Sequence, residues 1–337
     1  MNQSDALGRL DALPRERLGL LPTALTQAPQ LAARIGLPSL WVKHDELIGF
    51  GVGGNKVRAL ELLLGDALSQ GADTLVTGAG VQSNHVRATA AAAAYAGMQC
   101  CALYWGNEPA AVQGNFKLVR LLGAQTRFTG SPDRAHVDTA IAQASVELRG
   151  AGRRPYAIPR GGACALGVLG HVLAVRELHQ QCLALGWQPE TIVLATGSGG
   201  TLAGWLLGCA LLGLPWRVEG ITVSRPADEA RARVVQLAGE AAALLALPPQ
   251  LQAADVVVHD GFIGEGYGIA TAAGRAAILL AAHSQGLFLD PTYTGKAFAG
   301  LMALTASGQF QGRGPTVFLH TGGEPALFAQ TQDLHSL

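Results

Sequence analysis

Lys56 stands directly after two glycines and an asparagine, in the stretch Gly53-Gly54-Asn55-Lys56, ahead of a helix-like run. A lysine that is to form a Schiff base must be held still and kept partly out of water, because its amine has to lose a proton before it can attack. The glycines would let a bulky planar ligand approach the backbone. Taken alone, the segment fits a surface lysine at a helix start equally well, although a cation gains little there.

A second polar segment, Gln82-Ser83-Asn84-His85, follows an apolar strand-like run and opens a helix. Ser83 is a natural N-cap. The same geometry would bind a carboxylate, because hydroxyl and backbone N–H groups meet at a helix N-terminus, and an amino-acid substrate would supply one. Asn84 could donate a hydrogen bond to a phenolic oxygen of a cofactor.

A third segment lies between a strand and an apolar helix and combines glycines with hydroxyls, in the order Thr196-Gly197-Ser198-Gly199-Gly200-Thr201. Such a loop cradles a phosphate. It is neither a Walker loop, since no lysine follows the glycines, nor a clean dinucleotide fingerprint. A single phosphate monoester therefore fits best, ahead of a plain tight turn.

Three further short segments carry polar side chains in strand-to-helix loops or turns. They are Gly266-Tyr267-Gly268, Asp290-Pro291-Thr292-Tyr293-Thr294-Gly295-Lys296 and His320-Thr321-Gly322-Gly323-Glu324. Each alone is compatible with an ordinary turn, and a packed aromatic would explain Tyr267.

The composition excludes several classes of protein. Of the 337 residues, 49% are hydrophobic and 14% charged, which favours a large buried core over disorder. The formal net charge is zero, so a nucleic-acid or membrane-surface partner is not expected. The five cysteines have no CxxC spacing, which indicates reduced core thiols of a cytoplasmic protein and no metal site. We expect no signal peptide in Met1–Arg9, and the alanine-rich run Ala88–Ala94 is too short to span a bilayer.

Short apolar runs alternate with longer helical ones along the chain, a pattern that predicts α/β parallel sheets with helices on both faces. The predicted strands are Leu40–Lys43, Thr74–Thr77, Cys100–Tyr104, Gln125–Phe128, Tyr156–Ile158, Thr191–Ala195, Arg217–Val223, Asp255–Val258 and Thr316–His320. The predicted helices include Arg58–Gln70, Asn84–Ala96, Gly167–Gln181, Leu202–Leu212, Ile269–Gln285 and Gly295–Thr305.

Breaks around Gly49–Gly54 and Pro155–Gly162 divide the chain. We predict a smaller α/β domain, residues 59–164, inserted into a larger ligand-binding domain made of residues 1–58 and 165–337. Ligands bind at the carboxyl ends of the strands in open sheets of this kind, so the cleft between the two domains should hold the site.

Together, the motifs GGNKVR, QSNHVR, GYG, DPTYTGK and HTGGEPALF occur in an order that resembles the pyridoxal-phosphate enzymes containing D-cysteine desulfhydrases and 1-aminocyclopropane-1-carboxylate deaminases. The resemblance extends from about Leu21 to Phe328. It implies two open twisted parallel-sheet domains of the tryptophan-synthase-β type (fold type II), a homodimer, bound pyridoxal 5'-phosphate and a small amino-acid substrate.

The resemblance also implies roles for individual residues. Lys56 would carry the cofactor, with Asn55 beside it, and Asn84 would contact the cofactor's 3′-oxygen. Gly197, Ser198, Gly199, Gly200 and Thr201 would bind the cofactor's phosphate. Thr294 would contact its pyridine nitrogen. The substrate would meet Ser83 at its carboxylate, with Asn84, His85, Gly162, Tyr267, Tyr293 and Glu324 around it. The catalytic residues would be Lys56, Ser83, Tyr267 and Tyr293.

Two positions favour the desulfhydrase branch, because the deaminases resemble one another in having glutamate at the place of Thr294 and glutamine at that of His85. A hydroxyl leaves the pyridine nitrogen closer to neutral, which still supports loss of a good β-leaving group. Two departures from the family pattern, Ala163-Cys164 and Glu324, bear on the substrate. Glu324 could select a second polar group of the substrate or cap the next helix.

The expected reaction is therefore α,β-elimination with deamination, of D-cysteine in the first place, to pyruvate, sulfide and ammonia. The alternatives are 1-aminocyclopropane-1-carboxylate deamination, cysteate sulfo-lyase, D-serine dehydratase and racemase activity. A protein that binds pyridoxal phosphate or an amino acid without turnover is a non-enzymatic alternative. A nucleotide-binding oxidoreductase is disfavoured by the missing fingerprint.

Overall fold

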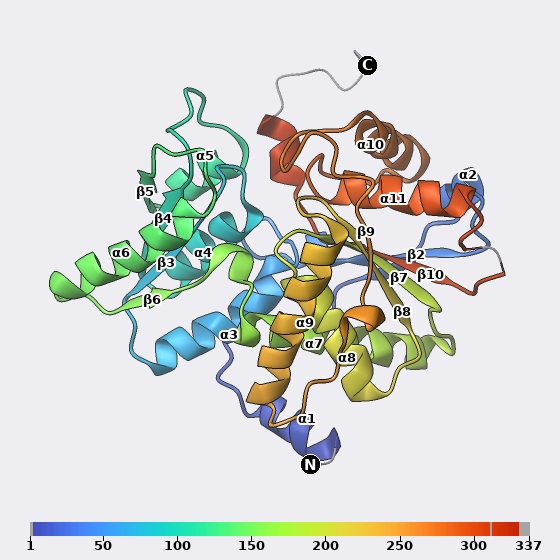
Figure 1. Cartoon of the computed structure of the whole chain (residues 1–337), viewed down its shortest axis with the longest axis horizontal. Coiled ribbons are helices and arrows are strands. Elements are labelled where there is room, and N and C mark those ends of the chain that lie inside the picture. Colours follow the sequence, from blue (N-terminus) through green and yellow to red (C-terminus); the bar gives the residue numbers. More distant parts are fainter. Residues whose placement is uncertain (1–2, 311, 330–337) are drawn as a thin grey trace.

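The computed structural model describes residues 3–310 and 312–329, and their strands form two sheets (Figure 1). The larger sheet has the order β1-β2-β10-β7-β8-β9 and is parallel except for the β1–β2 pair. Its strands are β1 (Leu25–Gln27), β2 (Leu40–His44), β7 (Thr191–Thr196), β8 (Arg217–Thr222), β9 (Val257–His259) and β10 (Thr316–His320).

The smaller sheet, with the order β5-β4-β3-β6, is parallel throughout. Its strands are β3 (Thr74–Ala79), β4 (Gln99–Tyr104), β5 (Gln125–Phe128) and β6 (Pro155–Ala157), and α4 (Asn84–Tyr95), α5 (Gly114–Leu121) and α6 (His136–Gly150) surround it. The expected α/β class with parallel sheets is confirmed. All four strands lie within residues 59–164, but the division into domains with those boundaries stays a prediction.

Helices cover both faces of the larger sheet. One apolar core joins α7 (Ala165–Leu185), α8 (Gly200–Leu212) and α9 (Ala227–Leu244) to the strands, and α1 (Gln3–Asp11) adds to it. A second core, on the opposite face, is built with α2 (Pro29–Ile35), α10 (Ala272–Gln285) and α11 (Thr294–Ala306). Among the described helices none is long and apolar enough to cross a membrane.

Helix α3 (Lys56–Ser69) packs on α7, and glycines make this contact close. A Cβ atom at Gly170 of α7 would lie 2.2 Å from the carbonyl oxygen of Arg58 in α3. The contact between α7 and α8 is equally close, because a Cβ at Gly204 of α8 would lie 2.4 Å from His171 Cβ in α7. The three helices therefore form one tightly packed wall, and α3 begins at Lys56.

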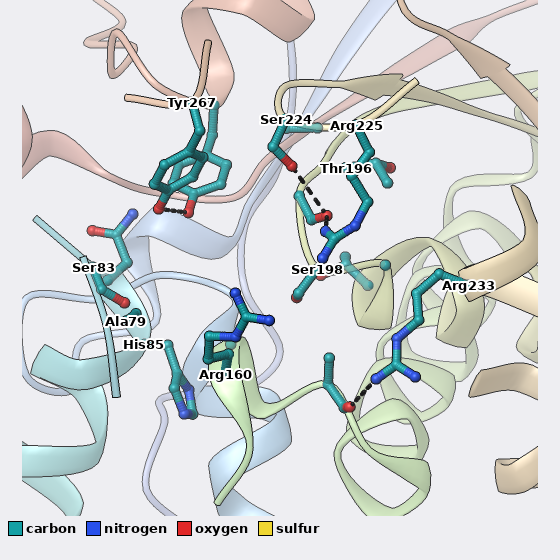
Figure 2. Close-up of a pocket in the computed structure, with 18 of the residues that line it drawn as sticks. Ala79, Ser83, His85, Arg160, Thr196, Ser198, Ser224, Arg225, Arg233 and Tyr267 are labelled. Atoms are coloured by element: carbon teal, nitrogen blue, oxygen red, sulfur yellow. Dashed lines mark hydrogen bonds between the residues drawn. The ribbon is translucent and has the colours of Figure 1, made fainter. Parts of the chain in front are cut away.

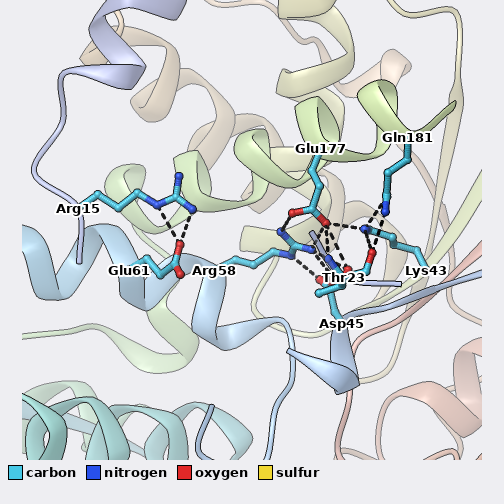
Figure 3. A network of polar contacts seen from close by, with 8 residues as sticks. All are labelled: Arg15, Thr23, Lys43, Asp45, Arg58, Glu61, Glu177 and Gln181. Atoms are coloured by element: carbon cyan, nitrogen blue, oxygen red, sulfur yellow. Dashed lines mark hydrogen bonds and ion pairs between the residues drawn. The ribbon is translucent and has the colours of Figure 1, made fainter. Parts of the chain in front are cut away.

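A buried polar network fastens the same wall to the N-terminal segment and to the larger sheet (Figure 3). Arg58 of α3 donates to both carboxylate oxygens of Asp45, at 2.6 and 2.8 Å, and to those of Glu177 in α7, at 3.0 and 3.1 Å. Lys43 of β2 donates to Glu177 at 2.5 Å and to the carbonyl oxygen of Thr23 at 2.8 Å. Because the charges are paired and hydrogen-bonded, their burial is tolerated.

Some element boundaries differ from the predicted ones for local reasons. The strand expected at Asp255–Val258 begins at Val257, because Ala253–Asp255 forms a 3-10 turn closed by a capping box between Gln252 and Asp255. The helix expected from Ile269 begins at Ala272, where Thr271 caps the backbone N–H of Gly274. The predicted elements did not include β1, α1, α2, α5, α6 and α9.

Candidate active site

A cavity of about 620 Å³ lies at the carboxyl ends of strands from both sheets (Figure 2). Ala79 at the end of β3 and Trp105 after β4 line it from the smaller sheet, and Thr196 of β7 and Thr321 after β10 line it from the larger one. Of the predicted site residues, those lining it are Asn55, Lys56, Ser83, Asn84, His85, Gly197, Ser198, Gly199, Thr201, Tyr267 and Tyr293. The loops that carried the polar motifs thus meet at one place.

Lys56 is the first residue of α3, and its amine reaches the cavity wall, where Nζ donates to the carbonyl oxygen of Gly161 at 2.9 Å. Burial lowers the pKa of this amine to about 8. The preceding Asn55 donates from Nδ2 to Thr201 Oγ1 at 2.9 Å, which ties the start of α3 to the first turn of α8. The lysine is therefore both fixed and easily deprotonated.

The glycines ahead of Lys56 do not line the cavity. Gly53 has a φ of 68°, and a Cβ there would lie 1.9 Å from the carbonyl oxygen of Glu46, so only glycine fits. Buried Arg87 of α4 donates to the carbonyl oxygens of Gly51 and Gly53. The glycines hold the lysine loop in place, a different purpose from the ligand approach expected from the sequence. Arg87 is the last residue of the QSNHVR motif, but nothing in the sequence predicted that it would clamp the lysine loop.

At the N-terminus of α4, Ser83 is the N-cap, and its Oγ accepts from the backbone N–H of Val86 at 3.3 Å. Asn84 Oδ1 accepts from Asn115 Nδ2 at 2.9 Å, which fixes the orientation of its amide. Both line the cavity, where the N–H groups of the first helical turn favour an anion.

His85 follows on the same turn and is a neutral imidazole, because burial and the charge of Lys56 lower its pKa to about 3. Thr77 Oγ1 donates to the carbonyl oxygen of Ile158 at 2.9 Å, so it must accept from His85 Nε2 at 3.1 Å. Nδ1 is then the unprotonated nitrogen, and it is buried without a partner among the described residues. The imidazole itself lines the cavity.

The loop between β7 and α8 forms the phosphate cradle expected from the sequence. Gly199, with a φ of 92°, is the N-cap of α8, and Ser198 and Thr201 present hydroxyls beside the free N–H groups of the first turn. Thr196 Oγ1 is buried without a partner among the described residues. Gly200 is buried behind the loop and does not line the cavity.

Arginines that the sequence did not single out surround this loop (Figure 2). Arg225 donates from Nη1 to the carbonyl oxygen of Gly197 at 2.9 Å and pairs with Glu229 at 2.8 Å. Arg233 of α9 donates to the carbonyl oxygen of Ala163 at 3.0 Å, and a Cβ at Gly199 would touch its Cγ at 3.4 Å. Both line the cavity, so the loop carries positive charge beyond its helix dipole.

Two tyrosines line the opposite part of the cavity, and their hydroxyls form a hydrogen bond of 2.6 Å. Burial raises the pKa of both Tyr267 and Tyr293, so both are neutral phenols near pH 7. A phenol pair has one hydrogen left over after its mutual bond. It can donate that hydrogen to a ligand.

Four predicted site residues do not line the cavity: Gly162, Gly200, Thr294 and Glu324. The fully buried Thr294 donates from Oγ1 to Asp290 Oδ1 at 2.8 Å and accepts from the Asp290 backbone N–H at 2.7 Å. Gly162 lies against the His85 ring, and Glu324 lies 3.8 Å from His320 Nε2. Their predicted roles toward cofactor or substrate stay predictions.

The residues that do line the cavity fit pyridoxal phosphate. Lys56 offers an accessible amine for an aldehyde, and the start of α8, with its hydroxyls and nearby arginines, suits a phosphate. The buried Thr196 hydroxyl precedes that loop and has no hydrogen-bond partner among the residues that the structure describes. Among the described residues no group of three or more His, Cys, Asp or Glu side chains is placed to hold a metal ion.

Comparison with known proteins gives consistent similarities. Residues 17–322 match the model of a family described as pyridoxal-phosphate dependent enzymes. A Pyrococcus abyssi protein, provisionally named a 1-aminocyclopropane-1-carboxylate deaminase, is 39% identical over 99% of this chain and 98% of its own. A Salmonella choleraesuis D-cysteine desulfhydrase is 39% identical over 96% of this chain and 98% of its own. The crystal structure of a homologue of 1-aminocyclopropane-1-carboxylate deaminase superposes with a TM-score of 0.91 at 36% identity, covering 98% of each chain.

Proposed function

The chain belongs to the family of pyridoxal-phosphate-dependent enzymes, and on that premise we propose that it eliminates the β-substituent of a small amino acid, with deamination. It is an enzyme of the group that contains 1-aminocyclopropane-1-carboxylate deaminases and D-cysteine desulfhydrases, with the fold type II architecture. D-Cysteine, giving pyruvate, sulfide and ammonia, is the first candidate substrate. A homodimer and a cytoplasmic location are parts of the same proposal.

The observation that carries the proposal is the buried amine of Lys56 on the cavity wall, with its pKa lowered to about 8. When bound, pyridoxal phosphate withdraws electrons from the α-carbon of an amino acid joined to its aldehyde. The α8 N-terminus, Ser198 and Thr201 would hold its phosphate. The Lys56 amine, buried on the cavity wall with a lowered pKa, would serve as the base that takes the α-proton of the substrate.

The substrate's α-carboxylate is best accommodated at the α4 N-terminus, where Ser83 and Asn84 line the cavity. Its β-substituent would then face Tyr267 and Tyr293, whose spare phenol hydrogen can protonate a departing group. His85 is kept neutral and adds no charge beside the reacting carbon. Each of these side chains acts on a different part of one small amino acid.

The nature of residue 294 supports β-elimination over ring-opening deamination. Thr294 has no carboxylate of its own that would keep a pyridine nitrogen protonated, and its hydroxyl is already engaged by Asp290. Loss of a good β-leaving group needs less electron withdrawal than opening a cyclopropane ring. This argument favours a desulfhydrase-like reaction.

The test is the near-visible absorption spectrum of the purified protein reconstituted with pyridoxal phosphate, before and after D-cysteine, with L-cysteine as the control. We expect a yellow protein whose spectrum changes with D-cysteine only, with pyruvate, sulfide and ammonia formed in equal amounts. Lys56→Ala should lose turnover entirely. A protein that takes up no pyridoxal phosphate, or normal turnover by Lys56→Ala, would refute the proposal.

A further inference from the structure

Arg134 is a cation in the cavity that the proposed reaction leaves unused. It precedes α6, on the side of the smaller sheet, and reaches Tyr267, which follows β9 of the larger sheet. Its guanidinium carbon lies 4.9 Å from the centre of the Tyr267 ring and 5.6 Å from that of Trp105. The aromatic faces hold the group in position, while its N–H donors stay free for a ligand.

The cavity supplies no anion for Arg134. Its two lining carboxylates, Asp138 and Glu229, are taken by Arg160, at 2.7 Å, and by Arg225, at 2.8 Å. Within the described part of the chain, the Arg134 side chain forms neither an ion pair nor a hydrogen bond, and its backbone carbonyl oxygen accepts from the N–H of Val137 at 3.3 Å. A guanidinium that lines the cavity between two aromatic rings and has no carboxylate partner is available to bind an anionic group of the ligand.

The two other anionic groups of the cofactor and substrate, the phosphate and the α-carboxylate, can each bind at a helix N-terminus. The cofactor phosphate suits the α8 N-terminus, and the substrate's α-carboxylate suits the α4 N-terminus. The remaining part of the substrate is its β-substituent, which faces Tyr267 and Tyr293 and therefore Arg134. A guanidinium fork beside a phenol O–H matches an oxyanion, since two oxygens of a sulfonate or phosphate can accept from the fork.

We propose that Arg134 selects amino acids whose β-leaving group is an oxyanion, a sulfonate or a phosphate, over those with a neutral one. The inference rests on the proposed β-elimination and refines its substrate class. For a β-sulfonate the Cα–H and Cβ–S bonds break, the proton goes to the Lys56 amine, and the electron pair of the Cβ–S bond leaves with sulfur as sulfite. The net reaction is cysteate plus water giving pyruvate, hydrogensulfite and ammonium, without any redox change. For O-phosphoserine the Cβ–O bond breaks and phosphate leaves.

The experiment compares kcat/KM of the holoenzyme for cysteate and O-phosphoserine with those for cysteine and β-chloroalanine, using both enantiomers of each. We expect an oxyanion substrate to be preferred. In Arg134→Gln the ratio of kcat/KM for that substrate to kcat/KM for β-chloroalanine should fall on the order of 10- to 100-fold, as expected for a charge-assisted hydrogen bond. Arg134→Lys should restore part of this ratio, because the charge returns without the fork.

The matched control is Arg120→Gln, because Arg120 also lies over an aromatic ring, that of Phe116 at 6.0 Å, but on the outer side of the smaller sheet and away from the cavity. In Arg120→Gln the ratio of kcat/KM for the oxyanion substrate to kcat/KM for β-chloroalanine should stay at the wild-type value. Equal losses for all substrates in Arg134→Gln, or preference for β-chloroalanine by the wild-type enzyme, would overturn the inference and leave the elimination reaction standing. Absence of elimination from every substrate would overturn both.

Discussion

Lys56 differs from an ordinary lysine in a property that can be measured directly. Burial lowers the pKa of its amine from 10.5 to about 8, so about a tenth of the amine is neutral at pH 7. Only the neutral amine attacks an aldehyde. The rate at which cofactor-free protein takes up pyridoxal phosphate should therefore rise with pH through 8 and level off above it, when followed by absorbance. A rate still rising steeply between pH 9 and pH 10 would contradict the lowered pKa.

Arg233 gives a second prediction at the same scale, concerning the cofactor phosphate. Arg233 lines the cavity, and its guanidinium has two partners in the described part of the chain, both neutral: the Ala163 carbonyl and the Gln236 amide oxygen, each at 3.0 Å. In Arg233→Gln the Kd for pyridoxal phosphate should rise about 10-fold, the weakening expected for one charge-assisted bond.

Pyridoxal, which lacks the phosphate, is the control ligand for Arg233→Gln. Its Kd, from the same absorbance titration, should be unchanged. If the affinity for pyridoxal fell by the same factor, Arg233 would support the loop and not the phosphate.

Which site residues the sequence could predict follows from how local their signals are. Lys56, Ser83 and Ser198 stand where a strand is followed by a helix, and this pattern alone predicts that they lie at the carboxyl ends of the strands. Arg134 and Arg233 have no such pattern, because each reaches the cavity only through tertiary packing. The motif containing Thr294 was easily seen, but its hydrogen bonds to Asp290 could not be derived from spacing.

At the scale of elements, the contact between α7 and α3 is a glycine contact with a testable consequence. A Cβ at Gly170 would meet the Arg58 carbonyl oxygen at 2.2 Å, and backbone cannot turn aside as a side chain can. Gly170→Ala should therefore push α3 outward and destabilise the protein by about 1–3 kcal/mol. Because α3 starts at Lys56, kcat should fall as well.

Gly239→Ala is the matched control, because Gly239 also lies within a long helix, α9, and a Cβ there would meet nothing within 4 Å. This change should stabilise the protein by about 0.5–1 kcal/mol through helix propensity. Urea unfolding of both variants measures the difference. Equal effects of the two substitutions would show that the α3–α7 contact has room for a methyl group.

Element prediction succeeded where apolar runs were continuous and failed where they were short. Strands β5 and β10 have the bounds that the sequence predicts, since each lies between turn residues. Strand β1 has three residues, none of them buried, so it forms only because β2 offers a free edge. Helix α5 has only eight residues, and α6 buries only four of its fifteen, so neither contains a long apolar run by which it could be recognised.

At the scale of the whole molecule, the network around Arg58 joins the N-terminal segment, the larger sheet, α3 and α7 (Figure 3). Arg58 ends the GGNKVR motif, but its partners Thr23, Lys43, Asp45 and Glu177 belong to no motif, and their pairing depends on four segments meeting. Glu177 is its centre, because Arg58, Lys43 and the backbone N–H of Thr23 all donate to it. Removing one partner leaves the others buried without compensation.

The pH dependence of stability follows from Glu177. Burial alone would raise the pKa of this carboxyl, but the hydrogen bonds and charge of Arg58, followed by those of Lys43, lower it from 4.5 to about 2. Since the folded pKa is below the unfolded one, the unfolded chain takes up the proton first. The contribution of Glu177, about 3 kcal/mol for this shift, is fully present above pH 4.5 and is lost as pH falls toward 2.

Glu177→Gln should therefore be less stable than the wild type at pH 7 by about 3–5 kcal/mol, because Arg58 and Lys43 lose a buried counter-charge. Its free energy of unfolding in urea should also fall less between pH 5 and pH 3 than that of the wild type. Glu147→Gln, which removes an exposed partner of Arg127, should keep the wild-type slope and lose at most about 1 kcal/mol. A wild-type slope in Glu177→Gln would mean that acid weakens the fold elsewhere, and the four joined segments would then owe their stability to the apolar cores alone.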